Sequence, residues 1–528
     1  WFYTLGRPGK IEDLIATIRD REDLAPLVEN PMLLTALCVL YDNGGRLPDD
    51  RYDLYKSIIA SVLHNRYPGD ASQREPALRR LEAIALGMHE GEATSPRMIP
   101  ALEVSWVEVE QWLARFAELS PAYERGQVEA AVRREELLTR SGLLLPRPNE
   151  RAAFHHSTFQ DFLAAQRIAR TRGDVGHVFR TRGATPEWRS TLLFLFAAQV
   201  SNRDPEWGLA LLGCLSAKQD RAAVKANPLT AVFIADALDL CLAKGYRLPE
   251  TLAEAFRRIA VGAIEDEVSL RERHALALTL GQVGDPRIFD LRDPAAYVEV
   301  PAGTYPSSAK GEALEIEAPF LLGKYPVTNS QYRAFMDDDG YAKREYWSDA
   351  GWAWLQEKGV DKPLAWDDRR WNGPNQPVVG VSFWEAEACC RWAGGRLQKE
   401  REWEAANSDS GDSRKHWGDG RPIKFSIFSA GGQLMVTAPV GLFPSACGPQ
   451  LGLMDINGNA WEWCDGQYNG SSAVGPINNP EMRVLRGGSF AGYWIFGKIS
   501  LPGLPTSARR REVGFRCVLA LPRQPVIS

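Results

Sequence analysis

The stretch "LGLMDINGNAWEWCDGQY", residues 451–468, decides how the second half of the chain is interpreted. Gly458 stands between two asparagines, and a glycine at such a position lets the backbone make a tight loop. Trp461 and Trp463 then alternate with Glu462, which is the pattern of a strand with two different faces. The stretch therefore predicts a tight loop that leads directly into a strand.

The sequence around this stretch differs from the first half of the chain. Twelve of the seventeen tryptophans lie from Trp347 onward, and glycine and proline become frequent after about Tyr297. Helical periodicity is kept only in short pieces such as "EREWEAA", an amphipathic segment that would pack Trp403 inward. These features predict a compact, loop-rich α+β domain with aromatic packing.

Five motifs in this half resemble, in order, those of the formylglycine-generating-enzyme family. They are "KYPVTNSQYRAFM", "PVVGVSFWEAEACCRWAGGRLQKEREWEAA", "APVGLFPS", "LGLMDINGNAWEWCDGQY" and "RVLRGGSF…VGFRC". The resemblance implies a sulfatase-modifying-factor domain, a relative of the C-type lectin fold, over residues 297–520. The fold class we expect is therefore multidomain, with an all-α N-terminal half followed by this α+β domain.

The same resemblance implies a structural calcium site in the loop "DINGNAWE". The carboxylates of Asp455 and Glu462 would supply charge, and the backbone carbonyls of Gly458 and Ala460 would supply neutral oxygens. Calcium favours such mixed oxygen ligands, although one loop offers fewer than the 6–8 that it takes. The alternative is that the two carboxylates simply accept hydrogen bonds from backbone amides in a tight turn.

Catalytic members of this family use two cysteines, five residues apart, between "GGS" and "GFR", where thiolates bind copper. Here that interval runs from Phe490 to Val513 and contains no cysteine. Cys517 lies beyond it, where we expect a buried structural residue. Related iron-dependent sulfoxide synthases need a histidine cluster supplied mostly by another domain, and His416 is the only histidine after His274. We therefore expect this chain not to be an enzyme, the alternative being an oxidase of the formylglycine-generating type or a related protein-modifying enzyme.

The cysteine-free interval reads "AGYWIFGKISLPGLPTSARRRE" and is rich in large apolar groups. It also resembles the variable region of proteins diversified by retroelements, which use the same fold and vary between "RGGS" and "GFR". Tyrosine and tryptophan supply large contact area at low entropic cost, so a binding surface for a protein or another surface ligand is one interpretation. The other is that these residues complete the hydrophobic core. The candidate ligand-binding residues are Phe490, Ala491, Gly492, Tyr493, Trp494, Phe496, Ser500, Gly503, Leu504 and Ser507.

The first half of the chain, to about residue 290, is predicted to be helical. Long amphipathic windows recur, and "SWVEVEQWLARF" places Trp106, Val109, Leu113 and Phe116 on one helical stripe. Strand-like alternation is scarce. In "ENPMLLTALCVLY", a proline follows an asparagine that can cap a helix, so a helix is expected to begin there.

Two segments, "ENPMLLTALCVLYDNGGRLPDDRYDLYKSII" and "LLPRPNERAAFHHSTFQDFLAAQRIA", resemble the C-terminal part of a NACHT module, the nucleotide-switch ATPase of STAND-type sensors. The resemblance covers residues 1–170 and includes a winged helix. It implies that two residues sense a nucleotide: Pro31 would pack on the adenine, and His156 would contact a phosphate. An imidazole can donate to a phosphate oxygen and release it when a domain moves. Read from the residues alone, Pro31 is a helix start and His156 a core histidine with satisfied hydrogen bonds.

The phosphate-binding loop G-x-x-x-x-G-K-[ST] does not occur in this sequence. We therefore expect ATP or ADP to bind only in a longer protein whose phosphate-binding half lies upstream. That upstream module would also be the route to oligomerisation. Residues 171–290 are expected to form a helical connector, because "SLRERHALALTLGQVGDPR" resembles a HEAT-type repeat.

Composition agrees with this assignment. The net charge of −5 gives no sign of a nucleic-acid or membrane partner, and no apolar run is long enough to span a bilayer. Eight scattered cysteines favour a reducing cytoplasm over a disulfide framework. The sequence thus predicts a cytoplasmic, ligand-recognising fragment of a STAND-type sensor, with a binding surface between Phe490 and Arg511.

Overall fold

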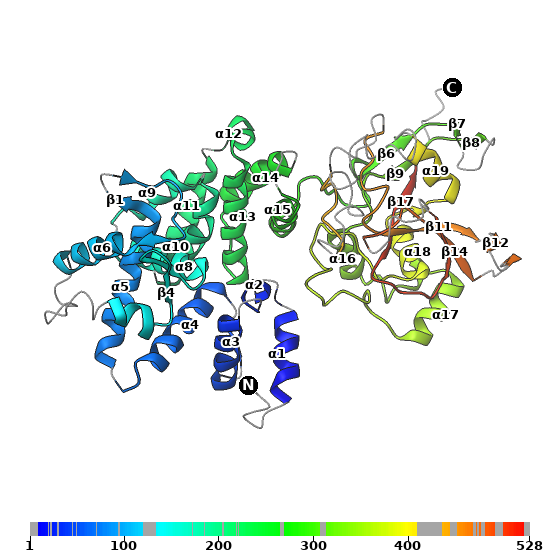
Figure 1. Ribbon diagram of the computed structural model, residues 1–528. Helices are drawn as coiled ribbons and strands as arrows, with labels where there is room; N and C mark the ends of the chain where they lie inside the picture. Colours follow the sequence, from blue (N-terminus) through cyan, green and yellow to red (C-terminus); the bar gives the residue numbers. More distant parts are fainter. Residues whose placement is uncertain are drawn as a thin grey trace. The chain divides into compact units, whose positions relative to one another are not determined.

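The structure is a computed structural model of the 528-residue chain (Figure 1). It describes residues 9–19, 21, 24–28, 31–44, 46–48, 50–69, 71–92, 95–119, 134–171, 173–183, 185–202, 205–217, 219, 221–264, 269–306, 313–408, 436–443, 451–467, 471–472, 475–476, 481–490 and 500–521.

The chain forms two compact units. The first unit contains Trp1–Lys218 and Asp236–Leu252, and the second contains Gln219–Ala235 and Ala253–Ser528. The helices of the predicted connector, residues 171–290, are therefore shared between the two units. The part of the connector nearest to the C-terminal domain packs with that domain.

The first unit is helical, as the sequence predicts, with a small winged sheet. The amphipathic stripe of α6 is confirmed, because Trp106, Val109, Leu113 and Phe116 are all buried. Its three-stranded antiparallel sheet has the order β3-β5-β4, with β3 at Val104–Ser105, β4 at Leu144–Arg147 and β5 at Arg151–Phe154. Its helices are α1 (Gly9–Arg19), α2 (Ala25–Val28), α3 (Pro31–Gly44), α4 (Arg51–Arg66), α5 (Ala71–Glu90), α6 (Trp106–Leu119), α8 (Ser157–Thr171), α9 (Val175–Arg182), α10 (Arg189–Asn202) and α11 (Pro205–Ala217).

Four helices follow, α12 (Arg221–Ala226), α13 (Pro228–Ala243), α14 (Glu250–Ile264) and α15 (Leu270–Val283). The last of them, α15, begins with a capping box: the Ser269 side chain accepts from the Glu272 amide, and the Glu272 carboxylate accepts from the Ser269 amide. It ends at Gly284, whose φ of 94° is in the region that favours glycine. The predicted helix is thus confirmed, with both ends defined by its own sequence.

The C-terminal domain contains two four-stranded sheets. One has the order β10-β17-β9-β6 and is antiparallel; its strands are Arg396–Leu397, Cys517–Ala520, Phe320–Gly323 and Tyr297–Val300. The other has the order β15-β14-β11-β16; its strands are Ser500–Pro505, Met482–Arg486, Trp461–Gln467 and Val513–Phe515. In this second sheet β11 pairs parallel to β16 and antiparallel to β14. The expected α+β domain is present, and the strand predicted at "AWEW" is β11.

Four helices accompany the sheets: α16 (Asn329–Asp337), α17 (Asp349–Lys358), α18 (Phe383–Trp392) and α19 (Glu400–Ser408). Both α16 and α18 begin with a capping box, at Thr328 and Ser382 respectively. On α19 the side chain of Trp403 is fully buried, as the amphipathic pattern predicts.

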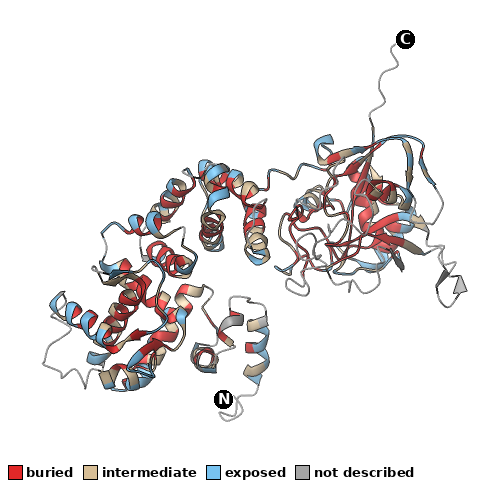
Figure 2. Ribbon diagram, turned by 45° about the horizontal axis from the view of Figure 1, so that its top comes forward, coloured by how far each residue is buried: buried red, intermediate tan, exposed pale blue. Residues whose placement is uncertain are grey.

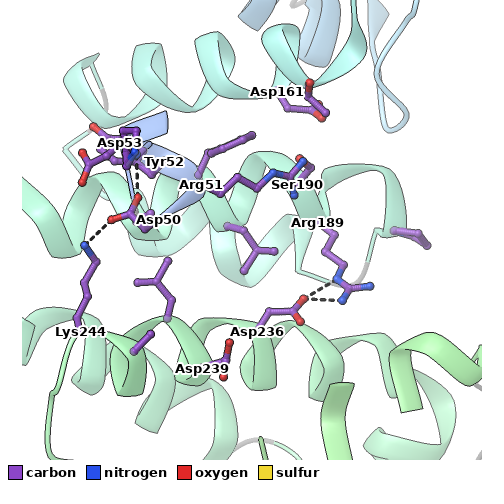
Figure 3. A pocket seen from close by; sticks show the side chains of 18 residues that line it. Asp50, Arg51, Tyr52, Asp53, Asp161, Arg189, Ser190, Asp236, Asp239 and Lys244 are labelled. Atoms are coloured by element: carbon purple, nitrogen blue, oxygen red, sulfur yellow. Dashed lines mark hydrogen bonds and ion pairs between the residues drawn. The ribbon is translucent and has the colours of Figure 1, made fainter. Parts of the chain in front are cut away.

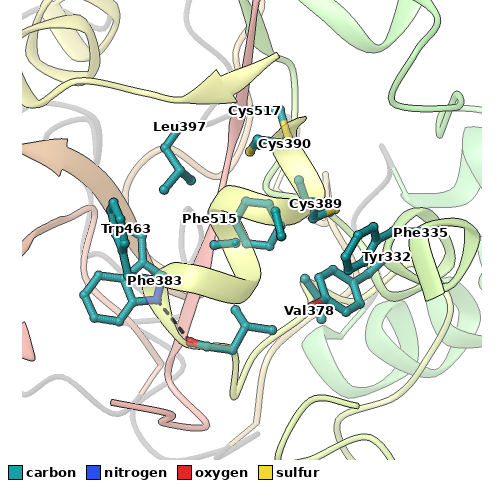
Figure 4. Packing of buried hydrophobic residues seen from close by; sticks show 14 of the residues in the cluster. Tyr332, Phe335, Val378, Phe383, Cys389, Cys390, Leu397, Trp463, Phe515 and Cys517 are labelled. Carbon is teal, nitrogen blue, oxygen red and sulfur yellow. Dashed lines mark hydrogen bonds between the residues drawn. The ribbon is translucent and has the colours of Figure 1, made fainter. Parts of the chain in front are cut away.

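The core of the C-terminal domain is aromatic. Tyr332, Phe335, Phe383, Trp463 and Phe515 are all less than 4% exposed, and Figure 4 shows them around α18. Ring pairs such as Phe383–Trp463, with centroids 6.1 Å apart, meet edge to face, the geometry that aromatic pairs prefer. In Figure 2 the strands of this domain are largely coloured as buried. No helix in the described part of the chain is long and apolar enough to cross a membrane.

Candidate functional site

The two residues predicted to sense a nucleotide lie in the first unit. Pro31 is the first residue of α3 and is exposed, so the predicted helix start is confirmed. His156 lies in the turn between β5 and α8 and is half-buried, with Nδ1 2.8 Å from Thr158 Oγ1. Burial lowers its pKa, Asp161 opposes this effect and Arg51 adds to it. Among the described residues no hydrogen bond joins Pro31 to His156, and their role toward a nucleotide stays a prediction.

A cavity of about 1110 Å³ lies beside His156, lined by α4, α8, α10 and the second half of α13 (Figure 3). Two ion pairs join residues that line the cavity: Lys244 Nζ is 2.7 Å from Asp50 Oδ2, and Arg189 Nε is 2.8 Å from Asp236 Oδ2. The lining contains five aspartates and three basic residues. This surplus of carboxylates disfavours a phosphate group, so we do not place the nucleotide in the cavity.

The loop "DINGNAWE" is a tight turn, as the sequence predicts. Asp455, Gly458 and Asn459 all have positive φ, of 53°, 100° and 66°. The Asp455 Oδ2 accepts from the Gly441 amide at 2.6 Å, and the Gly458 carbonyl accepts from the Ala460 amide at 2.8 Å. The loop is therefore held largely by its own backbone and by the neighbouring segment 436–443.

Glu462 forms a buried ion pair in β11. Its Oε1 accepts from Arg516 Nε at 2.8 Å, and its Oε2 accepts from Gln398 Nε2 at 2.7 Å. Glu462 and Arg516 are both 0% exposed. Burial raises the pKa of Glu462, and the guanidinium of Arg516 opposes that rise. Arg516 also donates to the carbonyls of Gly323 and Met454, so it ties three segments together.

These contacts do not fit the predicted calcium site. Both oxygens of Glu462 are used by a cation and an amide, and the Gly458 carbonyl is used by Ala460. The hydrogen-bond alternative considered for Asp455 agrees with its contact to the Gly441 amide. Within the described ranges no group of three or more His, Cys, Asp or Glu residues could hold a metal ion.

The cysteines of the described core are buried. Cys517 is 1% exposed, as expected for a structural residue, and its Sγ lies 2.8 Å from Cys390 Sγ. Burial raises the pKa of Cys389 and Cys390 well above the usual value, so both are neutral thiols at ordinary pH. They are packing residues and not the exposed thiolates that oxygen chemistry needs.

The predicted ligand-binding surface is only partly described. Phe490 is half-buried, with its ring centroid 5.1 Å from that of Trp371, and Ser507 is exposed. Gly503 is buried, whereas Leu504 is half-buried and packs against the core; both belong to β15, which pairs with β14. Ser500 also lies in β15, opposite Arg486, but its side chain is not described. Outside the described residues lie Ala491, Gly492, Tyr493, Trp494 and Phe496.

Three residues near Phe490 were not found from the sequence. Asn459 holds segment 436–443 through its side chain, accepting from the Ala438 amide at 2.9 Å and donating to the Ala438 carbonyl at 3.0 Å. Its backbone carbonyl accepts from the Phe490 amide at 3.2 Å. Trp371 and Asn375 belong to one loop, and Trp371 packs against the ring of Phe490. The position of Asn459 beside Gly458 in a tight loop could have indicated a structural role. The sequence does not indicate its partner, Ala438, which lies 21 residues away.

Comparison with known proteins defines the class of each half. Residues 289–521 match the family model described as a sulfatase-modifying factor enzyme 1-like domain. Residues 58–168 match a winged helix-turn-helix domain C-terminal to NACHT. The chain therefore joins a NACHT-associated winged helix to a formylglycine-generating-enzyme-like domain, as the motifs predicted.

Individual relatives align with the C-terminal domain. The hercynine oxygenase of Mycolicibacterium thermoresistibile is 36% identical over 236 residues, 39% of this chain and 48% of that protein. The formylglycine-generating enzyme of Thermomonospora curvata is 29% identical over 37% of this chain and 82% of that protein. The inactive Cα-formylglycine-generating enzyme 2 of Bos taurus is 29% identical over 43% of this chain and 89% of that protein. The chain spans about half the length of the hercynine oxygenase.

These relatives correct one prediction. The expectation that this chain is not an enzyme rested on the missing cysteines, the missing histidine cluster and the missing phosphate-binding loop. It is contradicted by similarity to an oxygenase and to a formylglycine-generating enzyme over the C-terminal domain. The criteria were too narrow, because they tested only for the metal ligands of two known types of enzyme.

Proposed function

We propose that the C-terminal domain takes part in an oxidase-type reaction on a cysteine of a partner polypeptide, and that the winged-helix half links this reaction to a nucleotide switch. The observation that carries the proposal is the match of residues 289–521 to the sulfatase-modifying factor enzyme 1-like model, supported by the similarity to a formylglycine-generating enzyme and to a hercynine oxygenase. The proposal does not assign the residues that would bind the metal of such a reaction.

In this proposal the domain contributes recognition of the substrate. Phe490 and Trp371 form an aromatic pair at the start of the interval between "GGS" and "GFR". At the other end of the same interval Ser507, Arg510 and Arg511 are exposed. An apolar contact at one end of the interval and exposed guanidinium groups at the other suit a polypeptide that carries both an apolar residue and carboxylates.

The test uses the purified full chain, copper, oxygen, a thiol reductant and a peptide that carries the cysteine motif of sulfatases. We expect the cysteine side chain to become an aldehyde and to release its sulfur as hydrogen sulfide, while two equivalents of the thiol are oxidised to a disulfide and oxygen is reduced to water. The aldehyde is detected by a hydrazine reagent and by mass spectrometry. The variant Phe490→Ala should lower the rate about tenfold, while Phe289→Ala, at a residue that is 42% exposed, should leave it unchanged. Absence of both aldehyde and oxygen uptake with copper and with iron would refute the oxidase proposal.

A second candidate is a sensor that recognises a protein ligand through the segment from Phe490 to Arg511. It is favoured by the lack of cysteine in that interval and by the exposed arginines at its end. Binding would bias the nucleotide switch only if ligand and nucleotide affinities are coupled. Nucleotide exchange by the longer protein, measured with and without the ligand, tests this coupling, and equal rates would exclude it.

Diversification by a retroelement is a further part of this second candidate. It predicts a near-copy of the 3′ end of the gene that differs only at adenines, beside a reverse transcriptase gene. A fixed sequence without such a copy would leave an interaction module with one constant partner. The surrounding DNA decides between these two outcomes.

A further inference from the structure

The last connector helix, α15, is docked on the C-terminal domain through a buried asparagine. Asn375 is 0% exposed, and its Nδ2 donates to the Ala277 carbonyl at 2.8 Å and to Asp285 Oδ2 at 3.1 Å. A Cβ placed on Gly281 would come within 2.3 Å of Asn375 Oδ1. The helix therefore lies directly against the loop that carries Asn375, with no space between them.

A second contact fixes the end of the same helix. Arg287 pairs with Asp285 through two hydrogen bonds, of 2.9 Å from Nε and 2.7 Å from Nη2. It also donates to the carbonyls of Gly441 and Val440, at 3.1 and 3.2 Å. Burial opposes ionisation of Asp285, but the bonds from Arg287 outweigh it and hold the pKa of Asp285 below its usual value. The turn after α15 is thus attached to segment 436–443.

Hydrogen bonds continue from this contact to Phe490. The Val440 amide donates to the Asn375 carbonyl at 2.8 Å, and Ala438 exchanges two hydrogen bonds with the buried side chain of Asn459. The Asn459 carbonyl then accepts from the Phe490 amide. Every link is a backbone group or a buried amide, so each has a fixed direction and little freedom to adjust.

Side-chain packing forms a second connection between the same two ends. A Cβ placed on Gly373 would come within 2.8 Å of Leu278 Cδ2 of α15, so loop and helix are in close contact here. The loop is held by Gln376, whose Nε2 donates to the Thr437 carbonyl at 2.6 Å. Its first residue, Trp371, packs against the ring of Phe490. A shift of α15 therefore moves the loop that supports Phe490.

We propose that α15 is a positioning element for Phe490, with Asn375 as its positioning residue. A displacement of α15 changes the exchange protection of the Phe490 amide, and a ligand on Phe490 changes the stability of the end of α15. The biological use of this coupling rests on the proposed role of Phe490 in binding. The coupling itself can be measured without any ligand, so its failure and that of the proposed function are distinguishable.

The test is amide hydrogen exchange of the full chain, read by mass spectrometry with residue-level fragmentation. Gly281→Ala puts a methyl group where the Asn375 amide lies, so the amide or α15 must shift, and exchange of the Ala438, Val440 and Phe490 amides should become about tenfold or more faster. The matched control is Gly262→Ala on α14, where a Cβ meets only Val224 Cγ1 at 3.9 Å, and exchange there should stay within about twofold. The amides of β17 should be unchanged in both variants.

The reverse direction provides an independent test, because coupling between two sites is reciprocal. Phe490→Ala should speed exchange of the Gly284 amide, which bonds to the Gly281 carbonyl, whereas Phe289→Ala should not. If Gly281→Ala does not fold, Leu278→Ala loosens the contact between α15 and Gly373 without added bulk. Unchanged exchange at Phe490, or an equal rise throughout the unit including β17, would overturn the proposal.

Discussion

A single buried charged residue can connect several segments of the C-terminal domain. Arg516 is fully buried and bonds to Glu462 and to two carbonyls from different segments. A buried ion of this kind is strongly destabilising once it loses its partner, whereas an exposed pair is screened by water. Substituting a buried arginine should therefore lower the stability of this domain much more than substituting an exposed one.

The first prediction follows from this difference. Arg516→Leu leaves Glu462 buried without its cation, and we expect a loss of about 3–5 kcal/mol in the free energy of unfolding. Arg391→Leu, which removes a largely exposed pair with Glu387, should cost less than about 1 kcal/mol. Urea denaturation of the two variants measures the difference, and equal losses would contradict the assignment of Arg516.

The second prediction concerns pH. His274 on α15 is largely buried, and burial lowers its pKa from 6.5 to about 4. The unfolded chain therefore binds this proton more readily than the folded chain between pH 6.5 and 4. Stability should be complete above pH 6.5 and should fall by about 3 kcal/mol as the pH drops to 4.

The contribution of His274 can be separated by substitution. The glutamine in His274→Gln cannot titrate, so this variant should lose less stability on acidification than the natural protein. At pH 7 the variant should be the less stable of the two. Thermal unfolding at pH 7, 5.5 and 4 gives both slopes. If the two proteins have the same pH dependence, His274 is not the group responsible.

At the scale of elements, helix ends are set by local sequence. The N-cap Ser382 of α18 is buried; its side chain accepts from the Glu385 amide at 3.2 Å, and Glu385 Oε2 accepts from the Ser382 amide at 2.8 Å. Since α18 lies in the middle of the aromatic core, its start also fixes the position of Phe383.

The third prediction is a test of this cap. Ser382→Ala removes one of the two reciprocal bonds and should lower the free energy of unfolding by about 1 kcal/mol. Ser382→Thr keeps the hydroxyl and should recover part of the loss. Chemical denaturation measures both variants, and a change below about 0.3 kcal/mol for Ser382→Ala would show that the cap is not needed.

On the scale of the whole molecule, the boundary of the C-terminal domain is the main question. The family model begins at residue 289, but the compact unit includes α14 and α15. Without α15, the Asn375 side chain would lose its bond to Ala277, and Gly373 would lose its contact with Leu278. Polar groups that are left buried or newly exposed in this way reduce stability.

The fourth prediction compares two fragments. Residues 289–528 should unfold at a temperature roughly 5–10 °C below that of residues 253–528, because several buried hydrogen bonds at α15 are missing. Differential scanning calorimetry measures both midpoints. Equal midpoints would indicate that α15 is not a structural part of the domain.

The sequence by itself determined the two classes of domain, the amphipathic faces and the helix starts. Trp403, the stripe of α6 and the start of α3 at Pro31 follow from local patterns, because periodicity and capping act over a few residues. The tight loop at Gly458 followed in the same way, from a glycine between two asparagines.

Only the tertiary structure decided which partners the polar groups of these elements bind and which of their side chains are buried. Whether Glu462 binds a metal or a guanidinium depends on Arg516, which lies 54 residues away, and whether Leu504 is surface or core depends on the pairing of β15 with β14. The docking of α15 joins Asn375 to Ala277, 98 residues apart. Contacts over such separations are set by the packing of the folded chain, and no local pattern records them.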